Sequence, residues 1–431
     1  MPLAIGLVAS GLLASAIADA RVVDGCDLKP GAICEEMVLP FRGGLLDENL
    51  SGASFHKSDL SSAYIERTTL VRANLSETLL NDVVFLYGSL VDANLSGAAS
   101  TSIDFGGLSL RRANLRSVTF GKSTFTGVNA TGADLTGAEM PSMTIRRTPT
   151  RNSTWANADF TRAVLTNATI TDTSMAGASF ADADLRGAEI GTVDLSDADL
   201  SGVNLSDATL RIVRFSRAQL PVATLVDTAL FGADFTRANV SGLVLMDATV
   251  RGAIFSQASG NLVVKLSNLT GAADDGGYAN PNSLGRSDLR DSRFLDSDLR
   301  GVDFTGSDLR NSDFSGSNIR TAIFDSADMR GAILPDSALV GRPTFGCNRQ
   351  TRWSGDYAER FGPYCRSKGD KVTPAWCRDD YEKTPGLCAI CGRICIVGRG
   401  VDSGVTMAPT ACDRRQQAAT RLRTQAVSSS Q

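Results

Sequence analysis

An apolar side chain recurs at every fifth residue from Leu45 to Phe255, with no change of phase. Of the 43 positions in this series, 40 hold Leu, Ile, Val, Met, Phe or Trp, and the exceptions are Ser100, Ala130 and Thr150. A small residue, usually Ala, lies two residues before most of these positions. The apolar and small residues therefore alternate at spacings of two and three.

A period of five fits neither a helix nor a straight strand. In a helix, five residues overshoot a full turn by about 140°, and in a strand residues five apart point to opposite sides. A two-residue step keeps both side chains on one face, whereas the three-residue step requires a bend. A chain that bends inward once per five residues winds into a coil, and stacked coils bury a continuous core. The pattern therefore predicts a solenoid of short extended segments.

These units also resemble the A-(D/N)-L-x-x unit of the pentapeptide repeat family. Ala93–Gly97, Ala133–Gly137 and Ala183–Gly187 are clear examples, and the resemblance covers about 290 of the 431 residues. It implies an all-β fold, a right-handed quadrilateral β-helix with four repeats per coil. To this rod we add a small disulfide-rich C-terminal module, argued below.

A second series of apolar positions, one residue out of phase, contains twelve positions from Leu284 to Leu339. The small residues of this series are mostly Ser rather than Ala. We expect Val264 and Leu269 to carry the helix across the break between the two series. The rod is therefore predicted to continue through the change of phase.

Two segments interrupt the pattern. The segment 271–282 is rich in turn residues, and we interpret it as a tolerated insertion. An alternative is a calcium-binding or partner-binding loop built on Asp274 and Asp275, although their spacing matches no known calcium loop. The stretch Pro141–Trp155 keeps the phase although Thr150 replaces an apolar residue, so we expect the coil to bulge there without ending. The direction of the Trp155 side chain is left open.

Residues 2–18 carry no charge, are mostly apolar, and are followed by the small-x-small sequence Ala18-Asp19-Ala20. This pattern predicts a secretory signal peptide, although a positive charge before the apolar run is missing. An uncleaved anchor is the alternative, but the run is marginal in length for crossing a bilayer. We therefore predict an exported (periplasmic or secreted) protein with no transmembrane span after cleavage.

The composition changes after Leu339. The last 92 residues hold seven of the nine Cys and carry a net charge of +7, which leaves −11 for residues 1–339 because the whole chain is −4. An acidic rod therefore precedes a basic, cysteine-rich module. The predicted organisation is a signal peptide (1–20), an N-terminal cap (21–44), a first repeat block (45–258), a phase break with a loop (259–283), a second repeat block (284–340), the cysteine-rich module (341–413) and a disordered tail (414–431).

In an exported chain the cysteines predict a disulfide framework, because a module with few apolar side chains needs covalent links. A bridge between Cys26 and Cys34 would staple the N-terminal cap. Seven cysteines remain, which leave one unpaired and allow 105 pairings. Zinc bound by the cluster 388–395 with one more Cys, or a redox pair at 388 and 391, are alternatives. The disulfide candidates are Cys26, Cys34, Cys347, Cys365, Cys377, Cys388, Cys391, Cys395 and Cys412.

The sequence offers little for catalysis. Its single histidine, His56, follows the apolar position Phe55, so we expect its side chain to point into solvent without a partner. Gly121-Lys122-Ser123 resembles the end of a phosphate loop, but Arg116 stands where the first Gly is required. Carboxylates recur by repetition alone, so pairs of them are weak evidence for hydrolysis. We therefore expect no catalytic residue, no metal ligand and no cofactor.

The leading functional hypothesis is a non-enzymatic exported rod that acts as a binding or structural scaffold. Its partner would be an unidentified protein or surface, with no nucleic acid expected. Rows of exposed polar residues, including Arg162, Arg186, Arg237 and Arg300, suit a repeating partner. One alternative is an acidic DNA-mimic rod that inhibits a topoisomerase, known among pentapeptide repeat proteins and supported here by the charge of −11. The other is a polysaccharide-active β-helix enzyme.

Overall fold

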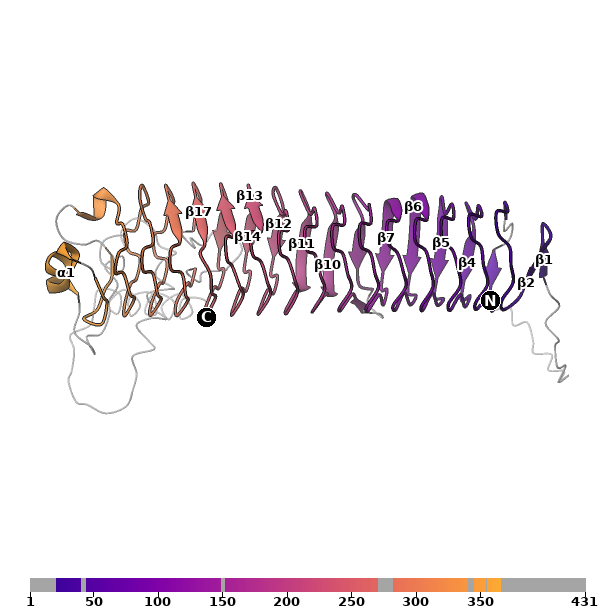
Figure 1. Ribbon diagram of the computed structural model, residues 1–431, viewed down its shortest axis with the longest axis horizontal. Coiled ribbons are helices and arrows are strands. Elements are labelled where there is room, and N and C mark those ends of the chain that lie inside the picture. The colour runs from indigo at the N-terminus through magenta and orange to yellow at the C-terminus, as the bar shows by residue number, and fades with distance from the viewer. Residues whose placement is uncertain are drawn as a thin grey trace, which may run out of the picture.

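The computed structural model describes residues 21–39, 44–148, 152–269, 282–339, 345–353 and 355–365. Within these ranges the chain forms one long rod of stacked coils, with β1 and β2 near one end and α1 at the other (Figure 1). The predicted all-β solenoid is confirmed. No helix in the described ranges is long and apolar enough to cross a membrane.

The strands are short and, apart from the first pair, parallel. One sheet runs in the order β16-β14-β12-β11-β10-β8-β7-β6-β5-β4-β3, with β9 paired to β10, and a second runs β13-β15-β17-β18. The antiparallel pair β1–β2 stands apart from both sheets. The strands are β1 (Arg21–Val23), β2 (Cys26–Leu28), β3 (Leu45–Leu46), β4 (Tyr64–Glu66), β5 (Val83–Leu86), β6 (Ala99–Gly106), β7 (Thr119–Thr126), β8 (Thr144–Arg146), β9 (Ser153–Thr154), β10 (Thr169–Ser174), β11 (Glu189–Asp194), β12 (Thr209–Arg211), β13 (Thr224–Val226), β14 (Ala229–Phe231), β15 (Val244–Met246), β16 (Thr249–Arg251), β17 (Val263–Lys265) and β18 (Arg293–Leu295).

The register between strands fixes the length of a coil. Leu45 lies beside Ile65, and Ile65 lies beside Phe85. Each coil therefore holds four five-residue repeats, and the rod has four faces. We number the faces by the inward residues of their first three coils: face 1 (Leu45, Ile65, Phe85), face 2 (Leu50, Leu70, Leu90), face 3 (Phe55, Leu75, Leu95) and face 4 (Leu60, Leu80, Ser100).

The core is a column of side chains along the rod axis. Both the apolar residue of each repeat and the small residue two positions earlier point inward and are buried, as the two-residue step predicts. Aromatic rings stack from coil to coil, for example Phe215, Phe235 and Phe255 with centroids 4.7 and 4.4 Å apart. Trp155 also points inward, with 0% exposure and its ring 5.1 Å from that of Phe125.

The corners require a left-handed backbone conformation with positive φ, which few residue types adopt readily. The residue two positions after each inward apolar side chain commonly has positive φ, and Gly, Asp, Asn or Arg usually occupies it. At Gly202, with φ 65°, an added Cβ would lie 2.4 Å from Oδ1 of Asp182 in the previous coil. Glycine therefore meets two requirements there, the left-handed backbone and the close stacking of coils.

Between Leu45 and Leu334, the regular register changes at three places. Asn129 pairs with Thr154, one whole repeat later than the regular register requires, so an extra repeat leaves the coil between faces 1 and 2 without altering the phase. Val244 pairs with Val263, one residue earlier than the regular register requires, and this lost residue is the change of phase. Val263 then pairs with Arg293, ten residues or two repeats later than the regular register requires.

The second insertion leaves from the same corner as the first, between Leu269 on face 1 and Leu284 on face 2. Asn282 closes its base: its Oδ1 accepts a hydrogen bond from the Ala253 N–H, and its Nδ2 donates to the carbonyls of Val250 and Leu269. Residues 270–281, including Asp274 and Asp275, lie outside the described ranges. Val264 and Leu269 are buried and continue the core across the break.

Both ends of the rod carry a disulfide. Cys26 is bonded to Cys34 beside the β1–β2 pair, and Cys347 is bonded to Cys365 at the other end. Regular coiling stops after Leu334, because Asp336–Leu339 forms a 3-10 helix (η1). The second series therefore ends one position before Leu339, the last position that the sequence pattern predicted.

An aromatic cluster covers the C-terminal end of the core. Phe345 packs on Phe324, with centroids 5.5 Å apart, and on Phe361, with centroids 5.4 Å apart. Phe361 ends the only α-helix in the described ranges, α1 (Asp356–Phe361), which is followed by the 3-10 helix η2 (Gly362–Tyr364). The rest of the predicted module and the tail lie outside those ranges, including Cys377, Cys388, Cys391, Cys395 and Cys412.

Candidate binding surfaces

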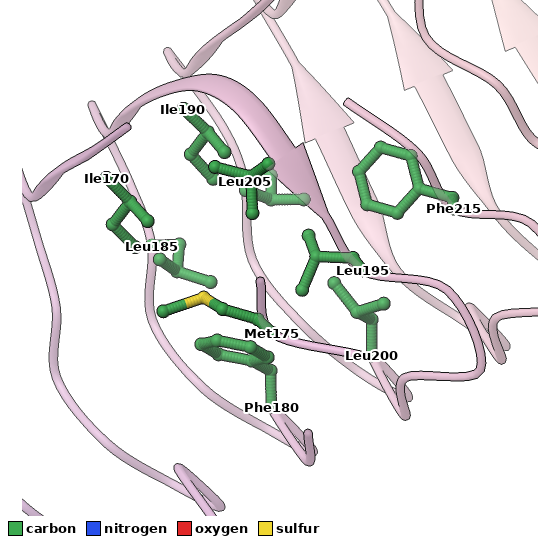
Figure 2. A pocket seen from close by; sticks show the side chains of 10 residues that line it. Ile170, Met175, Phe180, Leu185, Ile190, Leu195, Leu200, Leu205 and Phe215 are labelled. Atoms are coloured by element: carbon green, nitrogen blue, oxygen red, sulfur yellow. The ribbon is translucent and has the colours of Figure 1, made fainter. Parts of the chain in front are cut away.

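A small enclosed hollow lies inside the core and offers no polar group (Figure 2). Its volume is about 10 Å³, and its lining is wholly apolar, with Met175, Phe180, Leu200 and Phe215 among the side chains. A space of this size barely holds one water, which would find no hydrogen-bond partner there. The hollow lies where smaller side chains fill the coils between the Phe160–Phe180 stack and the column that starts at Phe215. The candidate binding sites are therefore on the outer surface.

On that surface, many polar side chains next to the strands bind their own coil. The Oδ1 of Asp134 accepts hydrogen bonds from the N–H and the hydroxyl of Thr136, at 3.0 and 2.6 Å. Asn204 and Ser206 repeat the arrangement at 3.0 and 2.7 Å. These bonds fold the chain at each corner. They give Asp and Asn a structural reason to recur before the apolar position.

The second repeat block carries a row of ion pairs on face 3. In each of three successive coils, the Nε and Nη2 of an Arg donate to both oxygens of the Asp two residues earlier, at 2.6–2.8 Å. The coils lie about 4.8 Å apart. Contacts of 3.8 Å from Arg290 to Asp308 and 3.7 Å from Arg352 to Asp328 connect one coil to the next. The pairs of this row, which we call the Asp–Arg row, are Asp288–Arg290, Asp308–Arg310 and Asp328–Arg330.

The C-terminal part of this row borders a surface hollow. The hollow has a volume of about 650 Å³, and its lining includes Asp308, Asp328, Arg349, Gln350 and Arg352. Its wall is therefore mostly polar and carries charges of both signs.

The opposite face carries the same motif. On face 1, Arg300 binds both oxygens of Asp298, and Arg320 lies one coil further on beside Asn318. Bidentate pairing fixes the guanidinium plane of Arg300 as it does in the Asp–Arg row. Arg320 donates its backbone N–H to the Asn318 side chain instead, so the fixed array is limited to face 3.

The pairing also shifts the protonation equilibria. Hydrogen bonds from Arg290 and Arg330 hold the pKa of Asp288 and of Asp328 below the ordinary value for a carboxyl group. The same bonds raise the pKa of Arg290 and Arg330. Both partners of each pair are therefore charged across the physiological pH range.

The arginines singled out in the sequence do not form one row. Arg162 lies on face 3, Arg186 on face 4, Arg237 on face 2 and Arg300 on face 1, because their spacings do not match whole coils. Arg186 binds Asp184 at 2.6 Å, and Arg237 binds Gln257 at 2.8 Å. Each of these four arginines therefore lies on a different face of the rod.

The expectation for His56 was wrong. The imidazole is partly buried, and its Nδ1 lies 2.8 Å from the Ser76 hydroxyl and 3.2 Å from the Ser76 carbonyl, one coil away. This contact fastens two coils together. Lys122 and its neighbours lie within β7, and Ser123 points inward with 1% exposure, so they form no phosphate loop.

In the described ranges, no group of three or more His, Cys, Asp or Glu side chains is placed so that it could hold a metal ion. Five of the cysteine candidates lie beyond Cys365, outside those ranges.

A sequence signal for the Asp–Arg row exists but needs a different period. In the second block Asp-Leu-Arg or its equivalent starts at residues 288, 298, 308, 318 and 328, every tenth residue. In a coil of four repeats, a period of ten visits two opposite faces in turn. The five-residue period of the apolar positions does not reveal this ten-residue alternation.

Coils of four five-residue repeats are the geometry that the sequence resemblance implied. The family model for pentapeptide repeats matches in eight copies, and the matched residues are 58–97, 103–141, 151–180, 158–197, 192–221 and 297–336. The chain belongs to the pentapeptide repeat family. A comparison with curated protein sequences finds no match.

Several solved pentapeptide repeat proteins are similar to this chain. QnrB1, a plasmid-mediated fluoroquinolone resistance protein, is 20% identical over 45% of this chain and 94% of its own, with a TM-score of 0.31. HetL, involved in heterocyst differentiation regulation in the cyanobacterium Nostoc, is 23% identical over 67% of this chain and 90% of its own, with a TM-score of 0.16. A pentapeptide repeat protein from the Arabidopsis thaliana thylakoid lumen is 33% identical over 27% of this chain and 70% of its own, with a TM-score of 0.14.

Proposed function

We propose that this pentapeptide repeat protein is a non-catalytic, exported binding rod that uses the Asp–Arg row of its second block to hold an extended partner. The observation that carries the proposal is the bidentate pairing of Arg290, Arg310 and Arg330 on successive coils. Ordered side chains lose little conformational freedom when a partner binds, so each added contact yields more affinity.

The partner that fits such a row is long and repetitive. Each guanidinium keeps N–H donors that its Asp does not use, and these donors recur about every 4.8 Å along one straight face. An extended protein segment, or the flat surface of another protein, offers carbonyl or carboxylate acceptors at comparable spacing. The row therefore suits a protein partner or a protein-bearing surface.

Cross-linking in the native host tests the proposal. The intact protein and the triple variant Arg290→Gln, Arg310→Gln, Arg330→Gln are compared for cross-linked partners by mass spectrometry. The matched control replaces Arg67, Arg112 and Arg217 by Gln, since these arginines also pair with Asp but lie in the first block. Loss of a partner from the first variant but not from the control is expected. Equal partner profiles in all three proteins would contradict the proposal.

Export is supported by the two disulfides, because such bonds persist in oxidising compartments and are rare in the reducing cytosol. Mature protein recovered from the native cell is expected to begin near Arg21. N-terminal sequencing that finds Met1 on the mature protein would overturn the export part of the proposal and leave the binding part untouched.

A DNA-mimic inhibitor of a topoisomerase is the second candidate. The charge of −11 over residues 1–339 favours it, and so does a column of exposed carboxylates at one corner, Asp207, Asp227 and Asp247, one coil apart. A DNA supercoiling assay with purified topoisomerase separates the two candidates. Inhibition by the intact protein that is lost on Asp227→Asn would favour the mimic over the binding rod.

A further inference from the structure

One sheet of the rod is apolar on its outer side as well as on its inner side. The strands β13, β15, β17 and β18 lie side by side on face 4, and their central residues point into the core. Most of their outward side chains are also apolar and only partly buried. These outward residues are Val226, Val244, Met246, Val263 and Leu295.

The same face carries polar residues elsewhere on the rod. At the equivalent outward positions a few coils earlier lie Asp184 and Arg186, which bind each other. The change to valine and methionine is therefore local to these coils. A contiguous apolar patch with a polar border is typical of a surface that meets another protein.

The corners that border this sheet are strained. Val222, at φ 53°, precedes β13, and Leu266, at φ 51°, follows β17. Their side chains are 65% and 52% exposed. A bulky or β-branched residue is unfavourable in the left-handed region, and an exposed apolar side chain gains no burial that offsets this cost. Burial by a partner would offset it.

We propose that this face, at β13, β15 and β17, binds the same face of a second copy of the chain. The two rods run in opposite directions, and the two-fold axis lies in the interface, parallel to β15. The proposal is independent of the Asp–Arg row, which lies on face 3 of the second block.

Charge complementarity favours a second copy of the chain as the partner and an antiparallel arrangement of the two rods. A two-fold axis parallel to β15 exchanges β13 and β17, the neighbours of β15 on its two sides. Lys265 at the end of β17 then faces Val226 and Asp227 of the partner subunit, and the reciprocal contact forms as well. Met246 and Val244 meet their own copies in the middle. Asp247 also meets its copy, with the two lysines one coil away on either side.

Rods in the same direction would form a poorer match. A two-fold axis along the rod places Asp227 and Asp247 against the opposite corner of the partner subunit, where the residues at 222 and 242 are Val and Gly and offer no cation. Isologous pairing with opposite direction is the arrangement that gives each carboxylate column a lysine.

The paired strands β13, β15 and β17 span about 14 Å along the rod. This is smaller than the roughly 800 Å² per partner of a standard stable interface. The expected dimer is therefore weak, with a dissociation constant on the order of micromolar.

Sedimentation equilibrium of the full-length oxidised protein, from about 1 to 100 µM, tests the proposal. Met246→Asp is expected to raise the dissociation constant more than about tenfold, since it places a charge at the centre of the interface. The matched control is Ile254→Asp, an apolar residue with 42% exposure on face 2 of the same part of the rod. The control should dimerise as the parent protein does.

The direction of the rods has its own test. Lys265→Glu and Asp227→Lys are each expected to weaken the dimer, and the double variant should recover it. Both residues are on the surface, and a positive-φ corner like that at Asp227 accepts lysine elsewhere in the rod, at Lys57, so these variants are expected to fold. Met246→Cys should give a cross-linked dimer under mild oxidation, whereas Ile254→Cys should not exceed the parent protein.

A monomer at every concentration would overturn the proposal. So would a dimer that Met246→Asp and Lys265→Glu leave unchanged, because the contact would then lie elsewhere. A dimer that both weaken, but that the charge exchange does not recover, would refute the opposite direction of the rods.

Discussion

The two repeat blocks reach the same coil with different interiors. In the first block (45–258) the small inward residue of each repeat is mostly Ala, whereas in the second block it is mostly Ser. The buried serines of the second block have partners: the hydroxyls of Ser307, Ser312 and Ser317 donate to carbonyls of the previous coil at 2.6, 3.0 and 2.7 Å. The small position therefore tolerates a hydroxyl because the stacked backbone supplies an acceptor.

The aromatic packing also differs. In the first-block column through Phe235, each ring stacks on rings of the same face. In the second block two columns on faces 2 and 4 meet across the core, and Phe304 lies edge-on to both Phe294 and Phe314 while stacking on Phe324. The ten-residue alternation that places Arg on faces 1 and 3 thus places Phe on faces 2 and 4. One period sets both the surface and the core.

The largest expected effect is common to the two blocks. Leu200→Asp and Leu309→Asp should each destabilise the fold by more than about 4 kcal/mol, because each buries a charge in the apolar column. Thermal melts with limited proteolysis measure the loss in each block. Equal losses would show that both blocks depend on the inward column, and a loss in only one would break that equivalence.

The control for the Leu200→Asp variant should disturb the hydrogen bonds at the neighbouring corner of the coil as little as possible. Ser201 donates its hydroxyl to Asp199 at 2.5 Å, so Ser201→Asp would remove a hydrogen bond and add a like charge. Ser201→Ala is the better neighbour control, with an expected cost of about 1 kcal/mol. A cost as large as that of Leu200→Asp would show that the inward assignment is wrong.

The difference in aromatic packing predicts that equivalent Phe→Leu variants in the two blocks lose different amounts of stability. Phe304→Leu loses contacts with three rings, whereas Phe235→Leu loses contacts with two. Ring pairs contribute about 0.5–1.5 kcal/mol each beyond burial, so Phe304→Leu should cost about 1 kcal/mol more. Denaturant unfolding of both variants checks the order. The reverse order would mean that contacts across the core add nothing to stacking along it.

The Ala–Ser difference predicts a smaller effect. Ser307→Ala should cost about 1 kcal/mol, since it removes the donor to the Leu284 carbonyl. Ala208→Ser in the first block should be nearly neutral, because Thr228, at the same position one coil later, already places its hydroxyl 2.9 Å from the Leu205 carbonyl. Melting temperatures of the two variants measure the difference. A large loss in Ala208→Ser would show that the first block is packed too tightly for a hydroxyl.

The smallest effect concerns pH. The pKa of Asp328 is lowered in the folded state by its bonds to Arg330, so its stabilising effect is present above the ordinary carboxyl pKa and is lost as pH falls through the lowered value. The second block should therefore melt slightly earlier below about pH 4. Arg330→Gln should flatten this dependence. An unchanged profile in Arg330→Gln would show that the pair does not contribute.

Periodicity in the sequence predicted the coil and the inward residues, because burial of every fifth side chain leaves few alternatives. The four-sided fold was implied by the resemblance to the pentapeptide repeat family. It could not show that Asn129 stacks on Thr154, since an insertion of one whole repeat is invisible to a period of five. The placement of Arg162 and Arg186 on different faces followed from spacing around the coil, which a count of fives does not reveal. The partner of His56 also depended on which residue lies one coil away.

The extra repeat between Ile145 and Trp155 has a consequence for the angular position of everything that follows. It leaves the coil at a corner, so Trp155 lies on the face that it would occupy if residues 147–151 were removed. Deleting those five residues should leave each downstream feature at the same angle around the axis. Deleting a repeat inside a regular coil, such as 196–200, would turn the remainder of the surface pattern by a quarter of the circumference. The chain can therefore gain or lose whole repeats at this corner, and every later residue keeps the same angular position around the rod axis.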